Sequence, residues 1–150
     1  MWLTASLALS LFGAQPATDA LIEVPCPWLP IFFENGATEL NDGARSQMDQ
    51  GGFLWFRNME GGSDTRIVLR TYTQGEPMSD VGRLSDARAD AVRAALIERH
   101  IPADHIMIAH TFGHELHMVD EGWVGGWVYP EYYVTRAFRA RWFPPGGPVC

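Results

Sequence analysis

The sequence contains no lysine, and all eleven of its basic residues are arginines, against eighteen aspartates and glutamates. The formal net charge is −7 at pH 7. Nucleic-acid-binding domains normally carry a basic face, and helices that lie on membranes are rich in basic residues. The composition therefore argues against nucleic acid or a membrane surface as the partner of this chain.

Charge is scarce as well. Charged residues make up 19% of the sequence, apolar residues 47% and aromatic residues 12%. This balance is too apolar for an intrinsically disordered chain. A length of 150 residues corresponds to about one domain with one modest core. We find no internal repeat, and we predict a single folded domain.

No hydrophobic run is long enough to span a bilayer, which needs about 20 residues. The longest run is Met1–Ala14, and small residues follow it at Ala17 and Ala20. This pattern is typical of a secretory signal, so we expect residues 1–20 to be a signal peptide that is cleaved after Ala20. No arginine precedes the run. An ordinary first helix or an incorrectly assigned start site therefore stays open as the alternative.

Cysteine is limited to two residues, Cys26 and Cys150, near the two ends of the chain. In an oxidising compartment a disulfide between them would close a long loop, which the chain-entropy model values at roughly 4–5 kcal/mol. Two unpaired thiols are the alternative, since the sequence does not show whether these positions meet. Neither position is favourable for a catalytic thiol.

Apolar periodicity predicts an order of β-α-β-α-β-β. This order indicates an α+β fold, a two-layer sandwich in which helices pack on a mixed parallel and antiparallel sheet. A proline-containing lead-in at residues 21–30 precedes these elements, and a Pro/Gly-rich tail at residues 144–150 follows them. The expected elements are a strand at 31–33 with a turn at Asn35-Gly36, a helix from Asn41 or Asp42 that weakens at Gly51-Gly52 and ends by Gly61-Gly62, a strand at 66–72, a helix at 84–99 with Ser85 as its cap, a strand at 105–111, a loop at 119–130 and a strand at 132–142.

Arg88 lies at an unusual position of the second predicted helix. At 100° per residue, Leu84, Val92 and Ala95 form an apolar stripe, and Arg88 falls in its middle. A guanidinium keeps its charge, so burial requires a partner. One possibility is an anionic ligand, which the amino-terminal end of the helix also favours. The other is an internal salt bridge, with Glu34, Asp80 and Glu115 as candidate partners.

Four segments carry a family resemblance. Leu84–Val92 (LSDARADAV) has the pattern L-S-x-x-R-A-x-x-V, and Ile31–Leu40 (IFFENGATEL) is similar to a strand and turn of the form VFFDFDSATL. Ile101–Ile106 (IPADHI) and Phe112–Glu115 (FGHE) are similar to a link into a third strand and to a G-x-G-E turn. In these motifs the chain resembles the OmpA-like peptidoglycan-binding domain, also found in peptidoglycan-associated lipoproteins. We place that domain at residues 31–143.

The resemblance implies a noncatalytic domain of the periplasm, associated with the outer membrane or cell wall. Such a domain holds the diaminopimelate-containing stem peptide of peptidoglycan, and no cofactor or metal is expected. In the family an Arg binds a carboxylate of diaminopimelate and an Asp binds its ammonium. Arg88 matches that Arg, whereas Thr73-Gln74 stands where the family has Thr-Asp. Glu76 or Asp80 is expected to substitute for the missing carboxylate. The ligand-binding set is thus Arg88, Gln74, Thr73, Glu76 and Asp80.

Several departures from the family keep a second function open. The acidic residue of the opening turn is replaced by Gly36, the asparagine before the helical signature by Val81, and Thr135–Ala140 matches its motif only loosely. A neutral amide at Gln74 binds an ammonium more weakly than a carboxylate does. The alternative is a divergent OmpA-like domain that has lost peptidoglycan binding. Such a domain acts through contacts with another envelope protein and holds Arg88 in an internal salt bridge.

The sequence offers little support for catalysis or metal binding. His110, His114 and His117 are spaced as zinc ligands on a helix would be, with His105 and Glu115 nearby, but this segment is predicted to be strand and loop. Ser85 lacks the flanking glycines of a nucleophile elbow. Trp123 and Trp127 lie in a glycine-rich segment and are expected to be exposed, where they can stack on a sugar or a partner protein.

Overall fold

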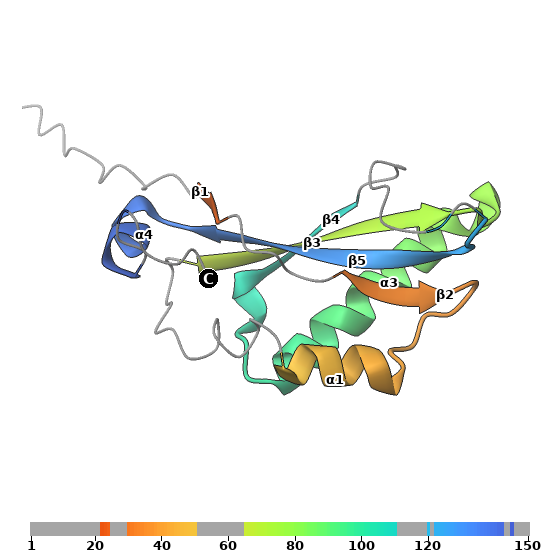
Figure 1. Cartoon of the computed structure of the whole chain (residues 1–150), viewed down its shortest axis with the longest axis horizontal. Coiled ribbons are helices and arrows are strands. Elements are labelled where there is room, and N and C mark those ends of the chain that lie inside the picture. The colour runs from red at the N-terminus through yellow and green to blue at the C-terminus, as the bar shows by residue number, and fades with distance from the viewer. Residues whose placement is uncertain are drawn as a thin grey trace, which may run out of the picture.

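In the computed structural model, one mixed sheet carries two helices, α1 and α3, on one of its faces (Figure 1). The structure describes residues 22–24, 30–50, 65–110, 120, 122–142 and 145, and the structural findings concern these residues. The elements are β1 (Ile22–Val24), β2 (Ile31–Glu34), α1 (Asp42–Gln50), β3 (Thr65–Gln74), α3 (Met78–Glu98), the 3₁₀ turn η2 (Ala103–His105), β4 (Ile106–His110), β5 (Gly125–Val134) and α4 (Arg136–Trp142).

The strand β5 is the centre of the sheet. It pairs antiparallel with β3 along one edge and with β1 and β2 along the other. The sheet order is β1-β5-β3-β4, and β2 also pairs with β5. β3 and β4 are parallel, because α3 carries the chain back between them. The fold is therefore α+β with a mixed sheet, as the sequence predicts.

The core lies between the sheet and its two helices. Along β3 the buried residues Ile67, Leu69 and Thr71 alternate with half-buried ones, as the predicted period of two requires. They face the apolar stripe of α3, where Val92 and Leu96 are fully buried. The remaining core residues come from every layer and include Ile31, Phe33, Met48, Ile106, Val128 and Tyr132.

The start of α3 differs from the sequence prediction. The helix begins at Met78 rather than Leu84, directly after Pro77, which occupies the N-cap position without a side-chain cap. Ser85 is therefore not a cap. It lies inside the helix, is buried, and its hydroxyl has no hydrogen-bond partner in the structure. The first turns of α3 contain Ser79, Asp80 and Gly82, residue types that are typical of turns, which is why the sequence predicts a later start.

The C-terminal prediction also needs correction. β5 begins at Gly125, inside the segment predicted to be a loop at 119–130, and ends at Val134. Residues 136–142 then form the helix α4 rather than the continuation of a strand. A hydrogen bond from the backbone N–H of Arg139 to the carbonyl of Thr135, 2.9 Å long, closes the first turn of this helix.

Other expectations fall outside the described residues. These are the signal peptide at 1–20, the pairing of Cys26 with Cys150, the helix predicted beyond Gln50, and the turn at Phe112–Glu115. The proposed domain limits are not tested by the structure. Of the helices in the described ranges, none is long and apolar enough to cross a membrane.

Candidate functional site

Arg88 is buried, as its position on the helical wheel predicts. Its side chain is 1% exposed and points from α3 towards the sheet. The guanidinium carbon lies 5.6 Å from the centre of the Phe33 ring of β2. The cation is thus removed from water and depends on protein groups for its charge and hydrogen bonds.

Those groups come from two separate segments. Arg88 Nε donates to the carbonyl of Ala37 at 2.8 Å, and Nη2 donates to the carbonyl of Glu34 at 3.2 Å. The carboxylate of Glu76 takes the outer edge of the guanidinium with both oxygens: Nη1–Oε2 is 2.7 Å and Nη2–Oε1 is 2.5 Å. This end-on pair is bidentate and charge-assisted, and such pairs are about twice as strong as hydrogen bonds between neutral groups.

Glu76 lies in the loop between β3 and α3, and its side chain is fully buried. Gly75 directly before it has a φ of 72°, a left-handed conformation that glycine adopts without strain. Oε1 of Glu76 also accepts the backbone N–H of Gly36 at 3.0 Å. Burial raises the pKa of Glu76, but the hydrogen bonds from Arg88 and Gly36 and the charge of Arg88 outweigh it and lower that pKa below its ordinary value.

We refer to Arg88, Glu76, Glu34, Gly36 and Ala37 as the Arg88 network. It ties the turn after β2 to the loop before α3, two segments about 40 residues apart in sequence. The ionised form of Glu76 is the form that the network favours. The network therefore neutralises Arg88 within the chain.

The sequence expects Arg88 to lie beneath its helix yet open to an outside acidic group. In the structure Glu76 takes the edge of the guanidinium formed by Nη1 and Nη2, and the side chain of Arg88 is 1% exposed. Two of the named internal partners also differ: Glu34 contributes its carbonyl rather than its carboxylate, and Asp80 pairs with Arg83 at 3.5 Å on the surface. The third, Glu115, lies outside the described residues.

The remaining predicted ligand residues are not joined to this network. Gln74, at the end of β3, donates from Nε2 to the carbonyl of Asp120 at 3.4 Å. Thr73 is half-buried beside it on the same strand. Within the described residues, the hydrogen bonds and ion pairs of Arg88 include none to Gln74, Thr73 or Asp80. The structure therefore brings together Arg88 and Glu76 from the predicted set of five.

A surface groove in the described part of the chain lies away from this network. It runs between the loop after β2, α1 and α3, and its volume is about 290 Å³. Neither Arg88 nor Glu76 lines it. The lining residues are Thr38, Glu39, Leu40, Arg45, Ala91, Ala94, Ala95 and Glu98.

The histidine cluster is only partly described. His105 is buried in η2, and its Nδ1 lies 3.5 Å from Oγ1 of Thr65. Burial lowers the pKa of His105. His114 and His117 lie outside the described residues, and the described ones contain no group of three side chains able to hold a metal ion.

The aromatic residues at the start of β5 behave differently from their sequence prediction. Trp127 is 1% exposed rather than open to solvent, because aromatic rings surround it. Trp123 is half-buried. Phe32, which the sequence analysis did not single out, is 37% exposed. Strand alternation is the signal that was available, since buried Ile31 and Phe33 require Phe32 to face the other way.

Comparisons with known proteins find similarity among solved structures. No family model matches the sequence, and no curated protein matches it either. Among solved structures, the chain is similar to the OmpA-like domain of FopA1 from Francisella tularensis subsp. tularensis SCHU S4. The TM-score is 0.49 at 15% identity, over 78% of this chain and 81% of that chain. The fold class of this chain rests on its own strand order and pairings.

Proposed function

We propose that this chain is a noncatalytic OmpA-like binding domain of the cell envelope that acts through contacts with another envelope protein. In this proposal Arg88 has an internal role: it holds two loops together instead of gripping a peptidoglycan stem peptide. The observation that carries the proposal is the bidentate pairing of Arg88 with Glu76, whose side chains are 1% and 0% exposed.

The energetics of ligand exchange support this role. A stem-peptide carboxylate has to displace Glu76 from Arg88, which exchanges one charge-assisted pair for another of the same kind. Glu76 then needs a new partner or water, and the backbone N–H of Gly36 loses its acceptor. The ligand's ammonium meets Gln74, which carries no compensating charge. The exchange therefore offers little net gain.

Peptidoglycan binding is the second candidate function, and one observation favours it. The carboxylate of Glu76 lies on Arg88 in the geometry that an incoming carboxylate would adopt, so the site is already shaped for that group. The loop that carries Glu76 is exposed on both sides of it, at Gly75 and Pro77. If this loop opens, a diaminopimelate carboxylate can take the vacated edge of Arg88.

Co-sedimentation with diaminopimelate-containing sacculi separates the two functions. We expect the wild-type protein to stay in the supernatant, and Arg88→Ala to lower the melting temperature without changing sedimentation. Under peptidoglycan binding, the wild-type protein sediments with sacculi, Arg88→Ala abolishes this, and Gln74→Asp strengthens it by supplying a charge for the ammonium. The exposed variant Arg83→Ala is the control, since its guanidinium lies at the surface.

A further inference from the structure

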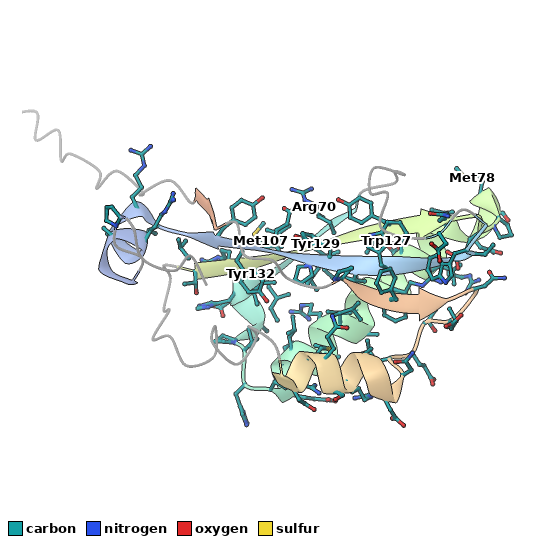
Figure 2. All side chains as sticks on the ribbon, in the orientation of Figure 1. Arg70, Met78, Met107, Trp127, Tyr129 and Tyr132 are labelled. Carbon is teal, nitrogen blue, oxygen red and sulfur yellow. The ribbon has the colours of Figure 1, made fainter. Side chains whose placement is uncertain are left out.

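Four aromatic residues gather on the face of the sheet opposite α1 and α3. Phe32 of β2 pairs in register with Trp127 of β5, and Trp127 pairs with Tyr72 of β3. The three rings therefore form a row across neighbouring strands, and Trp123 joins them from just before β5. Figure 2 labels Trp127 on this sheet. We refer to Phe32, Tyr72, Trp123 and Trp127 as the aromatic corner.

Within the aromatic corner, Trp127 is buried and contacts each of the other three rings. The Tyr72 ring stacks on Trp127, with ring centres 5.5 Å apart and an angle of 14° between the ring planes. Phe32 and Trp123 meet nearly at right angles, 83° apart at 5.8 Å. Trp123 reaches this place because Gly125 has no side chain; a Cβ there would overlap its ring. Phe32, at 37% exposure, presents ring surface to a partner.

Acidic groups border the aromatic corner. Glu34 follows Phe32 by two residues on β2, so its exposed side chain lies on the same face of the sheet. Asp120 is exposed, and its carbonyl accepts the backbone N–H of Trp123 at 3.1 Å. Among the described ion pairs, none involves the carboxylate of Glu34 or of Asp120. Within the described residues, aromatic surface thus lies beside two carboxylates for which no ion pair is found.

We propose that the aromatic corner, with Glu34 and Asp120, is a docking surface for an arginine-bearing segment of a partner protein. A guanidinium stacks on an aromatic face and pairs with a carboxylate at its edge, so it matches both features of this surface. The inference rests on the proposed function, because it names the surface through which the protein contact is made.

Charge favours an arginine-bearing segment over a second copy of the chain or a neutral glycan as the partner at the aromatic corner. A second copy of the chain would bring the same acidic groups against each other, on molecules that each carry a net charge of −7. A neutral glycan can stack on Phe32, and its hydroxyls can donate to a carboxylate, but it brings no positive charge to pair with the two acidic groups. A basic polypeptide gains from both, and the overall negative charge of the chain attracts it from a distance.

Fluorescence anisotropy with a labelled hexa-arginine peptide, run over a range of salt concentrations, tests this surface. We expect Phe32→Ser and Glu34→Gln each to weaken binding by about fivefold. Met107→Ser and Glu98→Gln are the matched controls: Met107 is an exposed apolar residue and Glu98 an exposed acid, both outside the aromatic corner. We expect the controls to bind as the wild type does.

Two results overturn the inference. If Glu98→Gln weakens binding as much as Glu34→Gln, the peptide senses only net charge. If peptide-free glycan chains from sacculi bind in a manner that needs Phe32 while hexa-arginine does not bind, the occupant is a sugar. Neither result depends on whether intact sacculi sediment the protein through Arg88, so failure of this inference is distinguishable from failure of the proposed function.

Discussion

Gly126 of β5 and Arg88 of α3 fit against each other with no room for a further atom. A Cβ on Gly126 would overlap Nη1 of Arg88 and would lie 2.8 Å from the carbonyl oxygen of Tyr72. The glycine thus leaves free the space that the guanidinium occupies between the helix and the sheet. A glycine inside a strand generally weakens that strand, because it is flexible and has no side chain to pack.

Gly126→Ala is expected to destabilise the protein by about 1–3 kcal/mol, because the added methyl group forces the buried guanidinium to move. Gly82→Ala in α3 is the matched control: no atom lies within 4 Å of its Cβ position. We expect that substitution to stabilise the protein by about 0.5–1 kcal/mol, since alanine favours a helix over glycine. Urea unfolding of the three proteins measures both changes. Equal unfolding free energies of Gly126→Ala and the wild type would contradict the close packing of Gly126 against Arg88.

Removing one member of the Arg88–Glu76 pair leaves a buried charge without its partner. We expect Glu76→Gln and Arg88→Met each to cost about 3–5 kcal/mol of unfolding free energy. The double variant removes both charges and is expected to lose clearly less than the sum of the two single changes. A double-mutant cycle from urea unfolding gives the coupling, and strict additivity would contradict a direct pair.

The surface pair of Asp80 with Arg83 provides the contrast for this cycle. The side chain of Asp80 is 44% exposed and that of Arg83 is 69% exposed, and Oδ1 of Asp80 lies 3.5 Å from Nη2 of Arg83. Because water screens such a pair, Asp80→Asn is expected to change stability by less than about 1 kcal/mol. A larger loss from Asp80→Asn would mean that this acid has a role beyond the surface pair.

The lowered pKa of Glu76 predicts how stability depends on pH. Its ordinary value is 4.5, and the hydrogen bonds from Arg88 hold the folded value below this. The contribution of the pair is therefore complete above pH 4.5 and is lost as the pH falls from 4.5 through the folded pKa. We expect the stability difference between wild type and Glu76→Gln to be largest near neutral pH and to shrink in acid. A difference independent of pH would contradict an ionised Glu76.

His105 predicts a second pH dependence at higher pH. Its ordinary pKa is 6.5, and burial lowers it; Asp104 opposes the shift and Arg66 adds to it. The folded protein thus favours the neutral ring, so stability falls as the pH drops below 6.5. His105→Gln is expected to remove this fall, whereas His100→Gln at an exposed position is expected to keep it. Thermal unfolding between pH 7.5 and 5 compares the variants.

Sequence patterns predict the features that depend on local periodicity, namely which residues of a strand or helix are buried. The alternation of Ile67, Leu69 and Thr71 gave the buried face of β3, and the helical wheel gave the burial of Arg88. Glu76 is a candidate to replace the carboxylate missing at Gln74, because the two residues are close in sequence. Its pairing with Arg88 was not predictable, since it depends on how the loop between β3 and α3 folds back.

Other differences arise where tertiary contacts override local preference. Gly125 and Gly126 are typical of a loop, yet they belong to β5, where they pair with β2 and β3. The Trp123 ring and Arg88 occupy the space that side chains at these two positions would take. The segment at 136–142 has a strand-like alternation, but it folds as α4 after β5 has ended. For Gly126 the neighbour is Arg88 of α3, which is distant in sequence and beyond the reach of a local pattern.

The bond from Gly36 to Glu76 has a consequence for the dynamics of an otherwise exposed turn. The amide hydrogen of a surface glycine normally exchanges with solvent within moments, yet this one is held by a carboxylate from a distant loop. It becomes free only when the turn and that loop part, an event that also uncovers Arg88. The rate of deuterium uptake at the amide of Gly36 therefore reports how often the turn and the loop separate and expose Arg88.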